Sequence, residues 1–233
     1  MGNLSEFLME ELNVATAFTI PIFGGIEVAE STVISWVIMA IIVILTLVLT
    51  RNMRVEKPGK LQVGVEYAVT ALQNLVRGII GHEGERYVPY LSTVLVFLGI
   101  SNIFAIFGMK PPTKDLNVTA ALALMSIILV QAASIRQNKV GGWLKGFTKP
   151  SKVITPLNVM ELAIRPLSLC MRLFGNVMGA FVVMKLLEHL VPVILPAVFS
   201  LYFDFFDGLL QAYVFVFLTG LYINCLLYTS DAA

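Results

Sequence analysis

Residues 158–190 read NVMELAIRPLSLCMRLFGNVMGAFVVMKLLEHL, a stretch that is apolar enough to lie in a membrane. It nevertheless carries Arg172 in its middle. On an α-helix, its polar side chains fall along one stripe, while the other faces carry Leu, Ile, Met, Val and Phe. That stripe consists of Glu161, Arg165, Ser168, Arg172 and Asn176. A guanidinium at the bilayer centre costs at least ~2.5–3.5 kcal/mol on insertion scales, so we expect Arg172 to be a functional residue with a partner for its charge.

A second interpretation of these cations is structural. Near a helix end, an arginine or lysine can extend its side chain to the lipid headgroups and needs no other partner. This interpretation suits Arg165, which precedes Pro166, and also Lys185. It suits Arg172 less well, because apolar sequence continues on both sides of that residue.

Three separated blocks of the chain resemble one known family. They are RPLSLCMRLFGN at 165–176, DLNVT at 115–119 and LQAYVFVFLTGLYI at 210–223. They are similar, in the same order, to recurrent blocks of subunit a of bacterial rotary ATP synthases, and the resemblance covers most of the chain from about residue 51. It implies a membrane stator subunit that conducts ions past a ring of c subunits and assembles with the b subunits of the peripheral stalk. It implies no cofactor, no nucleotide site and no enzymatic activity of the chain on its own.

The composition independently indicates an integral membrane protein. Of the 233 residues, 58% are hydrophobic and 13% are charged, and the mean hydropathy is +0.85. Soluble domains carry about 25% charged residues. The net charge of +1 gives no indication of a nucleic-acid partner. The cysteines and histidines are too few and too scattered to predict a disulfide framework or a metal site; they are Cys170, Cys225, His82 and His189.

Five apolar stretches predict an all-α membrane domain. The predicted spans are 33–50, 88–107, 118–135, 158–190 and 199–222. Residues 60–81 predict an amphipathic helix at the membrane interface. No Lys or Arg precedes Arg51, whereas 51–60 and 136–152 are basic. We therefore expect these two segments inside the cell and the N-terminus outside, in a multi-pass protein of the bacterial plasma membrane.

The last two predicted helices are expected to form a hairpin. The stretch 158–190 exceeds the ~20 residues of an upright span, which favours a steep tilt. Asp204, Asp207 and Gln211 form a second polar stripe on the following helix. If the two helices are antiparallel, the two stripes face one another in a seam that admits water. The resemblance places this hairpin against a c-ring.

Gly175 and Gly179 form a GxxxG pair beside Arg172. Small residues at this spacing allow another helix to approach closely. That helix belongs either to this chain or to another subunit. The resemblance favours a helix of the c-ring.

The resemblance also implies a mechanism. A c-ring carboxylic acid that meets Arg172 loses its proton, because the neighbouring cation favours the ionised form. Arg172 itself does not titrate, so it separates two aqueous half-channels. We expect Asp115 and the Asp204 region to line the outer path and Glu161 to line the inner one. The full set of candidate ion-path residues is Asp204, Gln211, Asn176, Glu161, Asp115, Asn117, Ser168 and Asp207.

Two positions depart from the best-known bacterial pattern of this family. Nine residues after Arg172 that pattern has Glu, and this chain has Phe181. Seven residues before Gln211 it has His, and this chain has Asp204. Our hypothesis is that Asp204 takes over as the acid of the outer path, with Asp207 as a helper. The alternative is that Asp204 lies in solvent before the helix.

Other functions remain open at this level. A secondary transporter with Arg172 as an anion site needs a compact pocket, and usually pseudo-symmetric halves, which the sequence does not show. An intramembrane enzyme needs a nucleophile and base, but Ser168 and His189 have no evident third group. We expect the transported ion to be a proton, although the carboxylate that distinguishes H+ from Na+ belongs to the partner. We expect one membrane domain over 1–224, because the tail CLLYTSDAA at 225–233 looks like translated adapter sequence.

Overall fold

The computed structural model describes residues 16–20, 26–51, 53–54, 59–82, 84–104, 111–148, 155–190 and 199–231. Inside these ranges, the side chains of residues 18–20, 26–27, 138–140, 143–148, 159, 188–190, 204 and 227–231 lie outside the description. The chain divides into two compact units. Unit 1 consists of Met1–Ile44, Phe97–Thr119 and Arg172–Ala212, and unit 2 consists of Leu45–Val96, Ala120–Met171 and Tyr213–Ala233.

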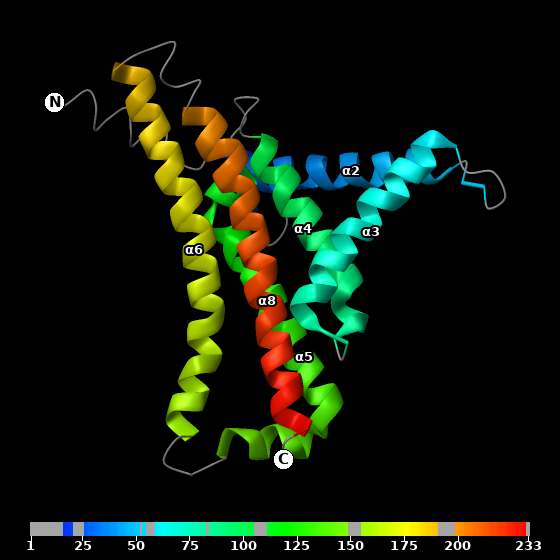
Figure 1. Cartoon of the computed structure of the whole chain (residues 1–233). Coiled ribbons are helices and arrows are strands. Elements are labelled where there is room, and N and C mark those ends of the chain that lie inside the picture. The colour runs from blue at the N-terminus through cyan, green and yellow to red at the C-terminus, as the bar shows by residue number, and fades with distance from the viewer. Residues whose placement is uncertain are drawn as a thin grey trace, which may run out of the picture. The chain divides into compact units, whose positions relative to one another are not determined.

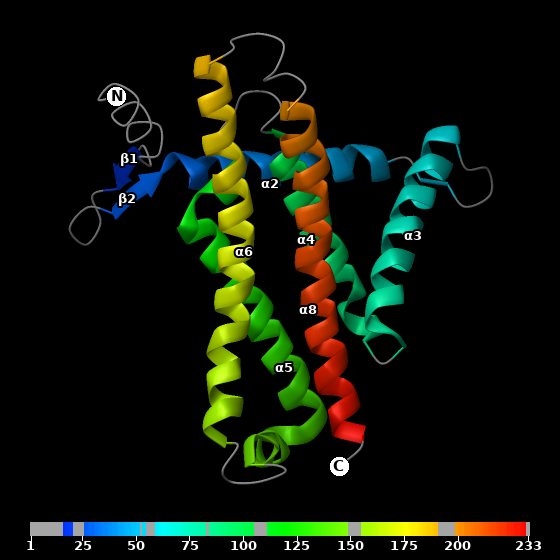
Figure 2. The same ribbon diagram turned by 60° about the vertical axis from the view of Figure 1, so that its left-hand side comes forward.

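Two short strands precede the first helix, in unit 1. β1 (Thr16–Ile20) pairs antiparallel with β2 (Ile26–Ala29), so that Ile20 lies opposite Ile26. Both strands are labelled in Figure 2. They add a hairpin to the helical fold that the sequence predicts. Strands of five and four residues lie at the short end of the alternating patterns that indicate a strand, and these two segments were not predicted from the sequence.

α2 (Glu30–Thr50) is the first long apolar helix. Its 21 residues correspond to about 31 Å, close to the ~30 Å thickness of the bilayer's hydrocarbon core. Ser35 and Ile38 are its buried residues, whereas large apolar side chains such as Leu47 and Val48 are exposed. The helix therefore presents an apolar surface that suits lipid.

α3 (Lys60–Ile80) is the amphipathic helix that the sequence predicts. Its C-terminal end is buried at Val76 and Ile80, and Gly81 ends it with a φ of 73°, a conformation that favours glycine. In unit 2 this end packs closely against Gly220 of the last helix. A Cβ at Gly220 would lie only 2.8 Å from Cγ2 of Ile79, so a larger residue there would clash. The location of α3 at a membrane interface stays a prediction.

α4 (Val88–Ile103) follows the 3₁₀ turn η1 (Glu85–Tyr87) and corresponds to the second predicted span. With 16 residues it is shorter than the ~20 of an upright span. The end of the predicted span, 105–107, lies outside the described residues.

α5 (Leu116–Thr148) follows the 3₁₀ turn η3 (Pro112–Lys114) and is longer than the predicted span 118–135. The helix continues through the basic segment because no proline interrupts it before Pro150.

The last helices are long and interrupted in different ways. α6 (Thr155–Leu190) has 36 residues, about 54 Å, and contains Pro166 in its interior. η5 (Leu201–Asp207) is a π-helix that leads directly into α8 (Gly208–Asp231). Within unit 1, the second half of α6 and the segment from η5 into α8 run side by side in opposite directions, and the first part of α2 runs across them (Figures 1 and 2).

Four helices in the described part of the chain are long and apolar enough to cross a membrane. They are Glu30–Thr50, Leu116–Gln137, Thr155–Leu187 and Leu201–Leu226. They correspond to the first, third, fourth and fifth predicted spans. The molecule is therefore a predominantly helical, multi-pass membrane protein, while the fifth crossing, through α4, stays a prediction.

Candidate functional site

Arg172 lies on the exposed surface of α6 in unit 1. Within the described part of the chain it makes no hydrogen bond and no ion pair. Gly175 and Gly179 follow on the same helix, and a Cβ added at either would meet no atom within 4 Å. The described residues therefore give no support to an intramolecular helix packed on this glycine pair. Arg172 is therefore an exposed charge on a helix face whose neighbouring glycines have no atoms of the described residues packed against them.

One turn after Arg172, α6 and α8 are joined by a pair of amides. Asn176 Nδ2 donates a hydrogen bond to Gln211 Oε1 over 2.7 Å. Gln211 is 2% exposed, and its Nε2 has no hydrogen-bond partner among the described residues. A buried polar group without a partner costs about 1–3 kcal/mol. This amide is therefore a place where a water molecule or a group from a partner would be stabilised.

The π-helix η5 carries both acids of the second predicted stripe. Asp207 is half-buried at its end, and the backbone of Asp204 lies in its middle. The side chain of Asp204 lies outside the described residues, so its role as the acid of the outer path stays a prediction. π-helical turns are rare and are often found at functional sites.

Asp115 lies at the start of α5 and is 4% exposed. Its Oδ1 accepts a hydrogen bond from the backbone N–H of Asn117 over 2.9 Å, which caps the helix. Its Oδ2 accepts a hydrogen bond from the hydroxyl of Ser31 on α2. The carboxylate is thus held on both oxygens, whereas the side chain of Asn117 is exposed.

Two further polar contacts meet at the same turn of unit 1. Thr113 Oγ1 donates to Asn102 Oδ1 over 2.9 Å, and Asn102 Nδ2 donates to the carbonyl of Gly208 over 2.8 Å. Lys114 Nζ lies 3.3 Å from the centre of the Phe181 ring. Consecutive residues of one short turn therefore contact α4 and α6, and through Asn102 they reach the junction of η5 and α8.

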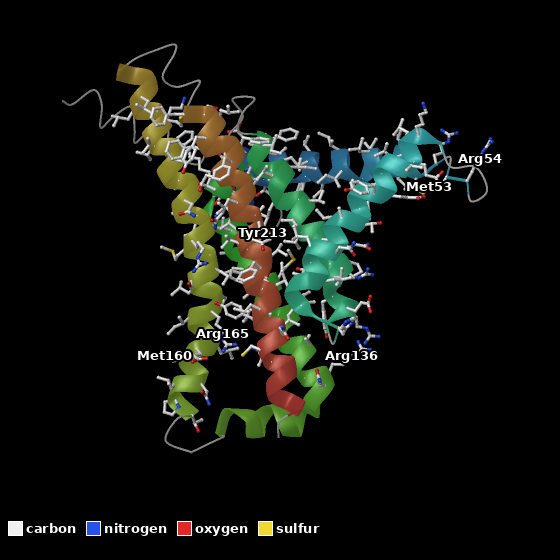
Figure 3. The ribbon with its side chains drawn as sticks, viewed as in Figure 1. Met53, Arg54, Arg136, Met160, Arg165 and Tyr213 are labelled. Carbon is white, nitrogen blue, oxygen red and sulfur yellow. The ribbon has the colours of Figure 1, made fainter. Side chains whose placement is uncertain are left out.

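The remaining predicted residues lie in unit 2. Glu161 forms an ion pair with Arg165, with 2.8 Å between Oε2 of Glu161 and the NH2 nitrogen of Arg165. The guanidinium of Arg165 also lies 5.2 Å from the centre of the Tyr222 ring, in cation–π range. Figure 3 shows Arg165 between α6 and α8. Beside it is a small cavity whose lining includes Pro166 and Thr219, and Ser168 is exposed on α6.

Sequence reasoning missed Ser31, Thr113 and Lys114. Ser31 and Asp115 are 84 residues apart, and no local pattern reports such a pairing. Asn102 did carry a signal, since it is an amide inside an apolar stretch. Among the described residues, no three His, Cys, Asp or Glu side chains are grouped so that they could hold a metal ion.

Long apolar helices, a hydrogen-bonded amide pair between two of them, and an exposed arginine that has no ion pair with the described residues define a class: a multi-pass membrane protein with a charged helix face. The family model described as ATP synthase A chain matches residues 32–224, and the chain belongs to this family.

Individual relatives agree with the family match. ATP synthase subunit a of Moorella thermoacetica is 37% identical over 201 residues, which cover 86% of this chain and 91% of that relative. ATP synthase subunit a 1 of Hahella chejuensis is 34% identical, with coverage of 86% and 85%. The sodium ion specific ATP synthase subunit a of Propionigenium modestum is 31% identical, with coverage of 86% and 74%.

Proposed function

We propose that this chain is the ion-translocating subunit a of a bacterial ATP synthase. In this role it works inside the complex, against a ring of c subunits and beside the b subunits of the peripheral stalk. It provides two aqueous half-channels that are separated by Arg172. The family match over residues 32–224 and the names of the relatives support the assignment to this complex.

The observation that carries the proposal is the open surface around Arg172. A guanidinium on an apolar helix needs an anion, and the described chain supplies none to Arg172. The open positions at Gly175 and Gly179 leave room for a partner helix to come close. A c-subunit helix with an acidic side chain provides both the missing anion and the missing packing surface.

The chemistry then follows from the charges. Arg172 favours the ionised form of the c-ring carboxylate, so the proton leaves on one side and is replaced from the other after rotation. Because a guanidinium keeps its charge, it also blocks direct passage between the two paths. We propose that Asp204, with Asp207, Asn176 and Gln211, serves one path, and that Glu161 and Ser168 serve the other. Asp115 and Asn117 are the next candidates for the outer path.

We propose H+ as the coupling ion. The carboxylate that binds the ion belongs to the c subunit, so this choice is tested by whether the reconstituted synthase makes ATP from an imposed H+ gradient in the absence of Na+. We also propose an outside N-terminus and cytoplasmic basic segments at 51–60 and 136–152. The charge pattern supports this orientation, since Lys and Arg are enriched in cytoplasmic loops.

An anion transporter is the less favoured alternative. It needs a pocket around Arg172, yet Arg172 is exposed, and the small cavity described in unit 2 is lined by Arg165 instead.

The test uses the whole synthase, purified with its c-ring and reconstituted in liposomes. ATP synthesis is driven by an imposed ion gradient, in the wild type and in Arg172→Ala. We expect the variant to co-purify with the c-ring and to synthesise no ATP above background. Native synthesis by the variant, or a purified chain without c subunits, would refute the proposal.

A further inference from the structure

Phe181 is a meeting point of two cations in unit 1. The ammonium of Lys114, on η3, lies 3.3 Å from the ring centre, well within cation–π range. The ammonium of Lys185, one helical turn further along α6, lies 5.8 Å from the same ring centre. The ammonium groups of two lysines therefore lie near the side chain at position 181, and that of Lys114 is the nearer.

Lys114 is held in place from both sides. Thr113 is fully buried and bonded to Asn102, and Asp115 is 4% exposed and bonded to Ser31. Lys114 itself is half-buried. The two anchored neighbours fix the backbone at Lys114, so its side chain starts from a defined position beside Phe181.

We propose that Lys114 is a positioning residue of the outer ion path: its ammonium occupies the face of Phe181, joins η3 to α6, and excludes an exchangeable acid from position 181, so that the acid of this path lies on η5. The inference deepens the proposed function and rests on it.

The exclusion follows from charge. A carboxylate at position 181 would lie against the ammonium of Lys114 and form an ion pair, which favours its ionised form. Such a group holds no proton to pass on. Phe181 instead binds the ammonium on the negative face of its ring and adds no second charge at this position.

The same turn also fixes the segment that carries the alternative acid. Thr113 and Asn102 form a chain of hydrogen bonds to the carbonyl of Gly208, the residue that follows Asp207. A Cβ at Gly208 would lie 2.8 Å from Cβ of Asn102, so this close approach requires glycine. This turn thus has two contacts. Thr113 is linked through Asn102 to the end of η5, and Lys114 lies against position 181 on α6, from which an acid is excluded.

The test is a rescue experiment in the reconstituted synthase, with gradient-driven ATP synthesis as the readout. In an Asp204→Asn background, we expect Phe181→Glu to restore little activity while Lys114 is present. Adding Lys114→Gln should raise the rate at least several-fold. Adding Lys185→Gln, the matched control that removes the more distant cation from the same ring, should raise it less. With residue 204 native, Lys114→Arg should retain activity, because arginine also binds aromatic rings.

Three results would overturn the inference. One is a full rescue by Phe181→Glu with Lys114 intact. Another is no gain, or an equal gain, from Lys114→Gln compared with Lys185→Gln. The third is native activity of Asp204→Asn alone, which would also remove Asp204 from the proposed path. Arg172→Ala reports on the proposed function separately. Each complex is checked for co-purified c subunits, and Lys114→Met replaces Lys114→Gln if the latter does not assemble.

Discussion

Arg165 and Arg172 lie seven residues apart on α6, yet their surroundings differ completely. Arg165 is half-buried, paired with Glu161 and packed on Tyr222. Arg172 is exposed and makes no ion pair with the described residues. A charge that is satisfied inside its own chain serves the fold. A charge that the chain leaves unsatisfied in an apolar helix indicates a partner.

The largest expected difference between the two sites comes from lysine substitutions. Arg172→Lys should lose most gradient-driven ATP synthesis, because a lysine shifts its pKa readily when it is desolvated and can lose its charge. Arg165→Lys keeps a cation for Glu161 and should remain near the native rate. Both variants are compared in proteoliposomes. Equal losses in the two would show that the environments do not separate the roles.

A smaller but still strong effect is expected from filling the open face beside Arg172. Gly179→Leu places a large side chain where a partner helix is proposed to pass, so coupling should fall by about an order of magnitude or more while the subunit still folds. Gly64→Leu is the matched control, since that helical glycine also has no neighbour within 4 Å. A harmless Gly179→Leu would argue against a close partner at this face.

The smallest effect is expected from Arg165→Ala. The variant loses a partly exposed ion pair, worth about 0–1 kcal/mol, and a cation–π contact of similar size. The melting temperature of the purified subunit should therefore fall by roughly 2–8 °C. ATP synthesis should stay above half of the native rate. A complete loss of coupling without a change in stability would make Arg165 part of the ion path.

The sequence predicted the features that depend on composition and long periodicity. The apolar runs of α2, α5, α6 and α8 are long enough to predict helices from the sequence alone. Arg172 was singled out because it is a charged residue among apolar ones. The hairpin of β1 and β2 was not predicted, since strands of five and four residues give only a few alternating positions. The contacts of Ser31, Thr113 and Lys114 were not predicted because they join segments that are distant in the sequence.

At the candidate site, too, the sequence predicted which residues are polar but not which of them are in contact. The sequence singled out Asn176 and Gln211 as polar residues of two stripes, but their direct hydrogen bond depends on the register of α6 against α8. The departure at Phe181 was visible in the sequence. Its partner Lys114 was not, since a lysine in a turn is ordinarily solvated.

The π-helix η5 has a consequence for how this family of chains can vary in length. A π turn holds more residues than an α turn, so a chain one residue shorter between Leu201 and Asp207 could be accommodated by tightening these turns. The same deletion between Gly208 and Gln211 would rotate Gln211 by about 100° relative to Asn176. A deletion within these wide turns therefore leaves the amide pair of Asn176 and Gln211 in register.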